Sequence, residues 1–495
     1  MISERDTMQR IDNRSTASSE EDIERDNATT SGSSASGTAP VPRMDEDRKE
    51  IAQAETKAVF RLKGLVLAIL VSSTIGVSLA VFYYLKQTEA KNLRNSFEYD
   101  SEKVFESVGS TLDRTLEAVD SFVVTTASYA EATNSSWPFV TIPNFAVRIA
   151  KIRTLAKAVY VGQLQYVSED QRRAWQNYSM QHSSWVEQSI AIQKEDKTYR
   201  GKIIEDYNKS EIIYGNYGDV PYGQGSYLPI WQSAPVVPIY PPFNWDGYQN
   251  AGIVSALPEL FEKRRVVLSA VTNLLDSTDP VLAANVAAQN DWLAEFLAPG
   301  DSVTEPSSDI YYPIFNTAAD YVDIKSDPNA KPVAIFSLTF FWRDLLTGVL
   351  PSGANGVIAV FENSCNQTFT YEINGQLAIY LGPEDKHDPA FNYMEKQSRY
   401  RDLRLVPVEQ GELGYTGLDL SDEFCPYTLR LYPSETFKSA FYSKNPVIFS
   451  VASICIFLFT SVVFIMYDCL VERRQRKVMR TGKCHLDFES LRSKF

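Results

Sequence analysis

The chain has 495 residues, 44% of them hydrophobic and 22% charged, with a formal net charge of −14 at pH 7. A chain of this length can form two or three domains with sizeable cores. The acidic balance argues against a nucleic-acid partner, because a protein that binds phosphates needs a basic surface.

Residues 1–63 have the composition of a disordered tail. The first 50 or so are rich in Ser, Thr, Glu, Asp and Arg, and the stretch at 29–40 is of low complexity. Too little apolar surface is available there to offset the entropy of ordering the chain. The sequence therefore predicts no fixed structure before the first apolar run.

Two long uncharged runs predict transmembrane helices at residues 64–85 and 445–467. Lys63 and Lys86 bracket the first run. The runs are 22 and 23 residues long, and roughly 20 apolar residues in a helix cross a bilayer core. Two buried helices of a soluble protein are the alternative, but such helices are usually shorter and amphipathic.

The charges beside the second span orient the chain, because its C-terminal side at residues 468–495 is strongly basic. The basic residues next to the span are Arg473, Arg474, Arg476, Lys477, Arg480 and Lys483. By the positive-inside rule this tail is cytosolic. Two spans bring the N-terminus to the same side, so residues 86–444 are expected outside a membrane, and we expect the plasma membrane.

A long stalk helix is predicted after the first span, over residues 86–133, because this stretch has no proline and carries one apolar stripe. The stripe consists of Val104, Val108, Leu112, Leu116, Val119 and Val123. These positions recur at steps of three or four, as on one face of a helix. The stripe either packs along the outer domain or pairs with the same helix of a second copy.

The rest of the outer domain alternates aromatic and β-branched residues with Gly and Pro, which predicts an α+β fold. Strands are expected at 139–142, 158–161, 310–315, 333–341, 356–362, 367–373 and 427–432, and helices at 171–195, 257–275 and 342–349. A strand, a short helix and several antiparallel strands follow one another as in a PAS-like sensor module. We therefore expect two such modules, a distal one at 137–300 and a proximal one at 305–440.

Few residues suit catalysis. The sequence contains no GxSxG, HExxH, Walker or dinucleotide-binding motif. Its three histidines are His182, His387 and His485. His387 lies in the cluster 384–388, whose residue types bind metals, but the flanking Gly and Pro residues indicate a solvated turn. We predict no catalytic residue and no metal site.

An aromatic segment is the better candidate for binding a small extracellular ligand. Tyr227, Trp231 and Tyr240 lie in a stretch rich in Gly, Tyr and Pro. Ligand pockets are mostly apolar with a few polar groups, and Tyr and Trp supply both. Arg343, just after an apolar strand, is a fourth candidate. The alternative is that these side chains fill a core.

Two further features agree with an extracellular position for the domain between the spans. Only two of the five cysteines, Cys365 and Cys425, lie there, and a pair in an oxidising compartment is most simply one disulfide. The same domain has four N-glycosylation sequons. Their asparagines are Asn134, Asn177, Asn208 and Asn366.

The first span carries small residues spaced by four, which therefore lie on one face of the helix. They are Ala68, Ser72, Gly76 and Ala80. Small residues at this spacing let two membrane helices approach closely, so this face is a candidate dimer contact. Small residues are also common in spans that have no such role.

Five sequence segments together resemble the receptor-type guanylate or adenylate/guanylate cyclases of microalgae. They are 137–144 (WPFVTIPN), 227–232 (YLPIWQ), 341–345 (FWRDL), 350–356 (LPSGANG) and 467–475 (YDCLVERRQ). The resemblance covers roughly residues 60–480. In that family a cytosolic tail, a span, a CHASE-like extracellular sensor and a second span precede a class III cyclase domain.

The resemblance implies a sensor that transmits ligand binding across the membrane, as a homodimer or as a heterodimer with a full-length cyclase. Beyond Arg480 the family continues into its catalytic domain, whereas only residues 481–495 follow here. We therefore expect no cyclase activity from this chain, and Mg²⁺ or Mn²⁺ with GTP or ATP only where a cyclase domain exists. The alternatives are a truncated product or gene model of a guanylate cyclase, and a structural membrane glycoprotein.

Overall fold

The computed structural model describes residues 44–196, 207–271, 305–321, 330–399 and 424–492, except 208, 216, 217, 221, 237–242 and 355, and also the single residues 287, 291 and 293. The predictions for the N-terminal tail up to residue 43, for Asn208 and for Tyr240 lie outside the described residues. The chain divides into two compact units. The first is Met1–Ser73 with Ser461–Phe495, and the second is Thr74–Thr460.

Two long helices carry the predicted spans: α1 (Met44–Ala132) and α10 (Asn445–Arg492). Both are long and apolar enough to cross a membrane. The two uncharged runs are therefore parts of longer helices, since no helix-breaking residue separates the first run from the stalk. Within the first unit, Lys63 of α1 forms an ion pair of 2.8 Å with Asp468 of α10.

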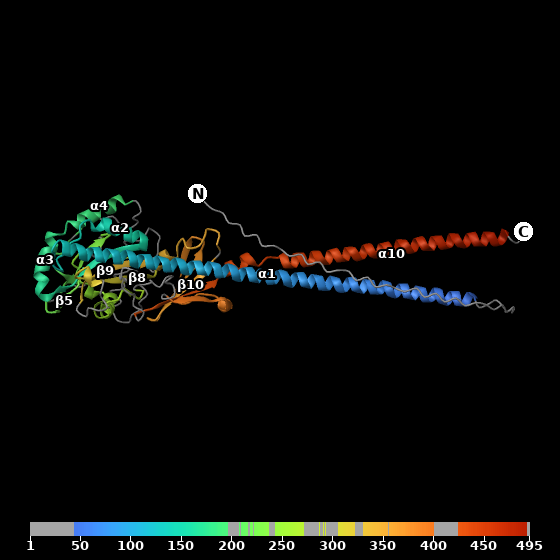
Figure 1. Ribbon diagram of the computed structural model, residues 1–495, viewed down its shortest axis with the longest axis horizontal. Coiled ribbons are helices and arrows are strands. Elements are labelled where there is room, and N and C mark those ends of the chain that lie inside the picture. The colour runs from blue at the N-terminus through green and yellow to red at the C-terminus, as the bar shows by residue number, and fades with distance from the viewer. Residues whose placement is uncertain are drawn as a thin grey trace, which may run out of the picture. The chain divides into compact units, whose positions relative to one another are not determined.

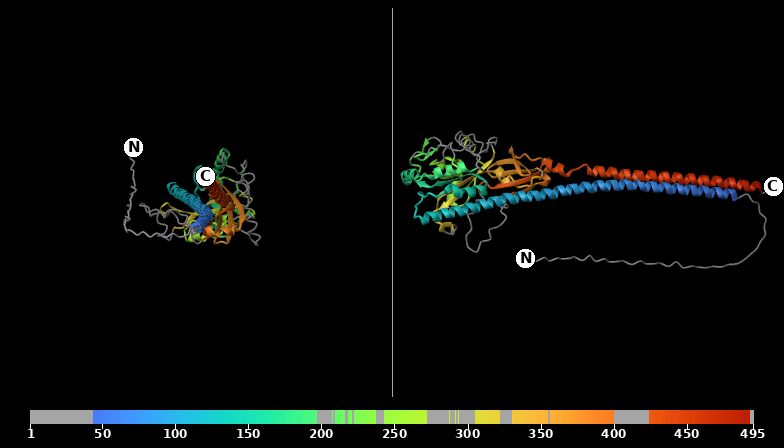
Figure 2. Two further views of the ribbon diagram at one scale, coloured as in Figure 1. Left: turned by 90° about the vertical axis from the view of Figure 1, so that its right-hand side faces the viewer. Right: turned by 90° about the horizontal axis from the view of Figure 1, so that it is seen from above.

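The stalk part of α1 packs along the outer domain, which is the first of the two arrangements expected for its apolar stripe. All six stripe residues are buried, four of them completely. The Phe122 ring lies 5.3 Å from that of Phe336, and the Phe97 ring lies 5.8 Å from that of Phe437. Figures 1 and 2 show this part of α1 running beside the sheets of the domain.

The sheet farther along α1 has five antiparallel strands in the order β6-β1-β9-β8-β7. They are β1 (Ala158–Gln165), β6 (Ile230–Ala234), β7 (Val267–Leu268), β8 (Ser307–Phe315) and β9 (Pro332–Phe341). One face packs against α1 and α2 (Phe145–Ala156) through residues such as Val161 and Phe336. The other face contacts α5 (Ala251–Leu257) and the π-helix η3 (Pro258–Glu262) through Leu164 and Leu260.

Beyond β6 lies an aromatic layer built from short elements. They are β2 (Val167–Ser168), η1 (Glu169–Gln171), α3 (Arg172–Gln181), α4 (Trp185–Glu195), β3 (Tyr214–Gly215), β4 (Gly218–Asp219), β5 (Ser226–Tyr227) and η2 (Gly247–Gln249). β2 pairs with β5, and β3 pairs with β4. This layer and the β6-β1-β9-β8-β7 sheet together form what we call the distal module.

The proximal module is a second five-stranded antiparallel sheet, in the order β12-β11-β10-β14-β13. Its strands are β10 (Val357–Asn363), β11 (Gln367–Asn374), β12 (Leu377–Pro383), β13 (Lys396–Arg399) and β14 (Tyr427–Pro433). The connecting helices are η5 (Ala319–Tyr321), α7 (Trp342–Leu346), η6 (Pro389–Met394) and α9 (Glu435–Phe441). Of the strands predicted within 305–440, those at 356–362, 367–373 and 427–432 are present in this sheet as β10, β11 and β14. Those at 310–315 and 333–341 are instead β8 and β9 of the other sheet, because they pair with β7 and β1. β12 and β13 were not predicted.

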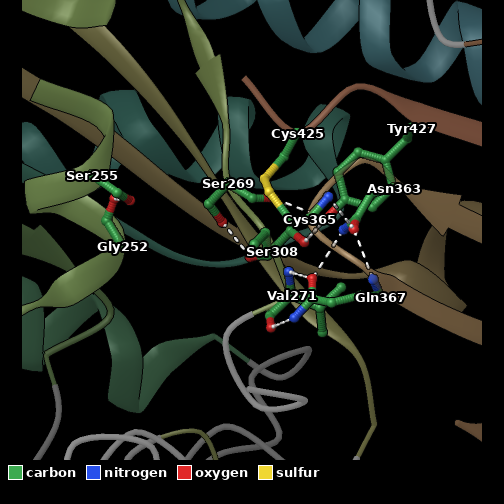
Figure 3. Close-up of a disulfide and its surroundings, with 11 residues drawn as sticks. Gly252, Ser255, Ser269, Val271, Ser308, Asn363, Cys365, Gln367, Cys425 and Tyr427 are labelled. Atoms are coloured by element: carbon green, nitrogen blue, oxygen red, sulfur yellow. Dashed lines mark hydrogen bonds between the residues drawn. A yellow bond between two sulfur atoms is a disulfide. The ribbon is translucent and has the colours of Figure 1, made fainter. Parts of the chain in front are cut away.

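The predicted disulfide between Cys365 and Cys425 is present, with the two Cα atoms 5.4 Å apart. It joins the β10–β11 turn to the residues before β14. Beside it, the Gln367 side chain accepts a hydrogen bond from the Val271 N–H (2.8 Å) and donates one to the Val271 carbonyl (2.7 Å). Figure 3 shows these contacts, which hold a segment following β7 of the distal module against the proximal module.

Four local predictions were wrong. Residues 44–63, predicted as the end of a disordered tail, are helical and form the start of α1, which is continuous with the first apolar run. Residues 139–142 are not a strand, because backbone groups of Val140 and Ile142 form hydrogen bonds with the side chains of Trp231 and Gln232 and not with a neighbouring strand. The helix expected at 257–275 ends at Glu262, and the chain turns at Arg264 (φ 57°) into the strand β7. The helix expected at 171–195 is two helices, α3 and α4, which are separated at residues 182–184.

Candidate functional site

Trp231, one of the predicted ligand-binding residues, is the centre of a buried aromatic cluster. Its side chain is fully buried, and its ring lies 5.2 Å from Trp175, 5.8 Å from Trp185 and 5.6 Å from Phe243. The indole Nε1–H donates to the Val140 carbonyl at 3.0 Å. With its ring packed and its only polar group bonded, Trp231 fills a core, as the alternative interpretation allowed.

Tyr227 connects this aromatic cluster to a buried arginine. Arg172, the first residue of α3, has no exposed surface. Its guanidinium donates to the Tyr227 hydroxyl (3.0 Å), to Asp219 Oδ1 (2.9 Å) and to the Val220 carbonyl (2.6 Å). The ring of Tyr222 lies 3.9 Å from the guanidinium carbon, close enough for a cation–π interaction. We call these residues, together with Glu169, the Arg172 network.

Glu169 completes the Arg172 network. Its Oε2 accepts hydrogen bonds from the Tyr227 hydroxyl (2.7 Å) and from the Gly223 N–H (2.8 Å). The bond from Tyr227 lowers the pKa of Glu169, while burial raises the pKa of Tyr227. Near neutral pH the network therefore contains a carboxylate, a neutral phenol and a guanidinium, which link α3 to the segment before β5.

The buried carboxylate of Asp246 lies near this network. Its Oδ1 accepts from the N–H groups of Leu228 (2.9 Å) and Tyr248 (3.3 Å), which caps η2. Burial raises the pKa of Asp246, and the charge of Arg172 acts in the opposite direction. Asp246 therefore positions the backbone that follows Tyr227 at the end of β5.

Sequence reasoning found Tyr227 but missed Arg172 and Glu169. Arg172 is followed by Arg173, which is exposed. No local pattern distinguishes the two arginines, because what separates them is which face of α3 packs against β5. The spacing of Glu169 and Arg172 at the start of a predicted helix was the only available signal, and such pairs are usually solvated.

Arg343 belongs to a different part of the domain. It lies on α7, and its guanidinium forms ion pairs with Glu305 (2.8 Å) and Asp344 (3.7 Å). The neighbouring Lys157 donates to the carbonyls of Asp344 (2.6 Å) and Thr347 (3.0 Å), closing the C-terminal end of this short helix. The described contacts thus assign Arg343 to the α7 region and not to the Arg172 network.

The predicted modification and contact positions are accessible where the structure describes them. Asn134, Asn177 and Asn366 are exposed. The four small residues of the candidate dimer face on α1 are exposed as well, and a Cβ built on Gly76 meets no heavy atom within 4 Å. These surfaces are open in the single chain.

The cluster at 384–388 forms a turn held by His387. The imidazole ring stacks on Tyr432 with 3.9 Å between centroids, and its two nitrogens lie 2.5 Å from Asp385 Oδ1 and 2.6 Å from Asn392 Oδ1. Among the residues that the structure describes, no group of three or more His, Cys, Asp or Glu is arranged to hold a metal ion.

Comparison with known proteins adds no assignment. No protein-family model matches the chain, and no curated protein matches its sequence. The functional argument therefore depends on the residues and contacts described above.

Proposed function

We propose that this protein is a membrane-anchored sensor whose outer domain binds a small extracellular ligand and transmits that binding across the membrane. One observation carries the proposal. The single helix α1 contains both an apolar run long enough to span a bilayer and the buried stripe along which the outer domain packs. A ligand-induced shift of the domain along this stripe is therefore also a shift of the span.

The chain leaves the domain next to the point where it enters. Ser443, just before α10, donates its hydroxyl to Glu89 of α1 at 2.6 Å. One turn or more further on, the Ser450 hydroxyl donates to the Ser78 carbonyl at 3.3 Å. Contacts of this kind let a change in the proximal module alter the second helix relative to the first.

A signal requires that the ligand bind one arrangement of the domain more tightly than another. The distal module is the natural place for such binding, because its short elements are joined by side chains more than by long strands. The Arg172 network is one such junction, and the Gln367–Val271 contact is the corresponding junction between the modules.

The rest of the proposal follows from charge and from resemblance. The basic tail after α10 favours a cytosolic C-terminus, and the two-span order then makes the N-terminus cytosolic at the plasma membrane. Two antiparallel sheets behind one long helix are compatible with tandem PAS-like or CHASE-like modules. The output goes through a homodimer or through a partner cyclase that supplies the catalytic domain with its GTP or ATP and Mg²⁺ or Mn²⁺.

The test uses the full chain in lipid nanodiscs. Spin labels are attached to cysteines introduced at Lys57 and Val478. The three native cysteines of α10 are changed to serine, so that only the introduced cysteines react. Amino acids, sugars and organic acids are screened for compounds that raise the melting temperature. The expected result is that a stabilising compound also changes the distance distribution between the labels. Stabilisation with an unchanged distribution contradicts signal transmission, and no stabilising compound favours a structural glycoprotein.

A further inference from the structure

Two glutamines of β1 present four buried polar atoms that have no hydrogen-bond partner among the described residues. Gln163 and Gln165 have no exposed surface. Neither the amide nitrogen nor the amide oxygen of either side chain forms a hydrogen bond with any residue that the structure describes. Buried side-chain amides in folded proteins are almost always bonded to protein, water or a bound molecule.

Strand pairing places both side chains on the same face of the sheet. Gln163 lies opposite Phe336 and Gln165 lies opposite Ala334 of β9. Leu164, between them, packs on the other face with Ile335. Alternation along a strand therefore directs both amides to the face that carries Val161 and Phe336.

An irregularity in β6 completes the surroundings of Gln163. The pairing of β1 with β6 shifts between Gly162 and Leu164, so Trp231 and Gln232 both lie opposite Gln163. The ring of Trp185 lies 5.8 Å from that of Trp231, and its Nε1–H is also buried and without a partner among the described residues. Unpaired donors and acceptors thus gather beside the aromatic cluster.

The neighbouring Gln232 shows that a glutamine side-chain amide in this region can form hydrogen bonds with the protein through both its oxygen and its nitrogen. Its Oε1 accepts from the Ile142 N–H at 2.7 Å, and its Nε2 donates to the Ile142 carbonyl at 3.0 Å. A buried polar group without such partners is destabilising. Four such atoms on one face of β1, next to a paired glutamine, require partners that the described residues do not supply.

The neighbours also define the chemistry of that molecule. On the adjacent strands the facing residues are Phe336, Ala334, Trp231 and Gln232, none of which is charged. A charged group placed among them would have no counter-charge on these strands and would be costly to bury. Each glutamine amide offers two N–H donors and a carbonyl acceptor, so the matching molecule carries both acceptors and donors.

We propose that Gln163 and Gln165 form a binding site for a small uncharged molecule with hydrogen-bond donors and acceptors, such as a carboxamide or a polyol. This inference rests on the proposed sensor function, for which it names a ligand class and a site in the distal module. Ordered water has the same hydrogen-bonding chemistry, and the experiment separates the two sources.

The probes are acetamide and erythritol, with acetate and methylammonium as charged counterparts, added to the purified full chain in detergent micelles. Melting temperature is followed in the wild type and in Gln163→Met and Gln165→Met, which keep side-chain length but remove the amide. Gln188→Met, on the exposed face of α4, is the matched control. We expect the neutral probes to raise the melting temperature, with a half-saturating concentration at least about tenfold higher in the two β1 variants and unchanged in the control.

Three results would overturn the proposal. Methionine variants that are more stable than the wild type, with no response to any probe, mean that the amides have no partner at all. Variants that are less stable, again without a probe response, mean that ordered water alone fills the site. Equal responses to acetate or methylammonium contradict an uncharged ligand.

Two further measurements keep these outcomes distinct. Trp185→Phe removes the unpaired indole N–H together with one ring of the indole and leaves both glutamines in place, so it gives a second test of probe binding if a β1 variant does not fold. A compound that moves the spin-labelled spans equally in the wild type and in Gln163→Met overturns this site and leaves the proposed sensor function intact.

Discussion

At the scale of single residues, burial gives similar side chains different roles. Arg172 and Arg173 are adjacent on α3, but Arg172 is fully buried with three hydrogen-bonded partners while Arg173 is exposed. Removing one member of a buried charged network leaves the others without partners in a region of low dielectric constant, whereas removing an exposed charge has little effect.

Arg172→Gln should therefore lower the free energy of unfolding of the outer domain by about 3 kcal/mol. The loss arises because the Val220 carbonyl and the Tyr227 hydroxyl lose their charged donor. Denaturant unfolding followed by tryptophan fluorescence measures the change, since Trp175 and Trp231 lie in the adjoining cluster. Arg173→Gln is the matched control, and equal effects from the two substitutions would contradict a buried role for Arg172.

The stability of the proximal module should depend on pH through His387. Partial burial lowers the pKa of His387, but hydrogen bonds with Asp385 and Asn392 outweigh this and leave the pKa above its ordinary value. A raised pKa means that the imidazolium is favoured in the folded state. Its contribution is fully present below the unfolded pKa of about 6.5 and is lost as pH rises through the folded pKa.

The wild type should thus lose this contribution as pH rises above about 6.5, and His387→Gln should reduce the pH-dependent change in stability by roughly 1 kcal/mol or less. Denaturant midpoints measured at several pH values test this. Unchanged pH dependence in His387→Gln would show that other groups account for the change.

At the scale of elements, the disulfide adds a short covalent link between two strands that the chain itself connects only through a long segment. Cys365 and Cys425 are 60 residues apart in sequence and join the β10–β11 turn to the start of β14. These strands carry the contacts with Val271 and Ser269 of the distal segment. The cross-link therefore stabilises the same strands that connect the two modules.

Replacing both cysteines by serine should lower the free energy of unfolding by about 4 kcal/mol, because the unfolded chain regains the freedom of a long loop. Chemical denaturation of the full chain with and without reductant measures the effect. Cys455→Ser, on α10, is the control and should leave the outer domain unchanged. Alkylation of both Cys365 and Cys425 in the non-reduced native protein would contradict the pairing.

The small-residue face of α1 is an element that a single chain leaves uncovered. Because Gly76 has open space around its Cβ position, Gly76→Leu should not disturb the folding of the chain itself. The larger side chain should instead separate two helices that meet on this face. We expect a several-fold weaker self-association in bilayers, measured by energy transfer between labelled copies.

Val77→Leu is the matched control for Gly76→Leu, because the neighbouring position is exposed and points away from the small-residue face. Equal association of the Gly76 variant and the wild type would remove this face as a dimer contact. The same pair of variants can be tested for association with a full-length cyclase.

At the scale of the whole molecule, the decisive property is the side of the membrane on which each segment lies. The exposed Asn134, Asn177 and Asn366 belong to the domain between the two apolar helices, and the basic residues follow the second helix. Oligosaccharide transfer occurs only on the lumenal side, and basic flanks stay in the cytosol. The two signals are independent and agree.

Expression with microsomes should therefore give a product whose mass falls on glycosidase treatment, and Asn177→Gln should reduce the shift by one glycan. Protease added outside the vesicles should remove both tails and leave the central domain intact. A protected C-terminal tail would reverse the proposed orientation. A glycosylated chain that makes cyclic GMP or cyclic AMP by itself would contradict the proposed dependence on a partner cyclase.

Local patterns in the sequence were enough to determine several features of this protein. The two apolar helices follow from uninterrupted composition, the stalk helix from a repeat of three or four residues, and the disulfide from the only two cysteines between the two apolar runs. The strands at 310–315, 333–341 and 427–432 follow from β-branched and aromatic runs. Apart from the disulfide, which follows from a count of cysteines, each of these signals is contained within the segment it describes, so no knowledge of distant residues was needed.

Only the tertiary structure determined the secondary structure of segments that contact residues far away in the sequence. Residues 263–271 have the composition of a helix, but Val267 and Leu268 pair with β8 and end the helix early. The segment 139–142 looks like a strand, yet side chains of β6 occupy its backbone groups. In both places contacts with distant residues outweigh the small differences in local propensity.

The candidate site was predictable only in part for the same reason. The aromatic segment around Tyr227 was visible because its composition is unusual. Arg172, Gln163 and Gln165 resemble many surface residues in sequence, and their burial depends on how β1, β5 and α3 meet. The cost of burying a polar or charged side chain is determined by the groups that surround it after folding, and these come from segments far apart in the chain.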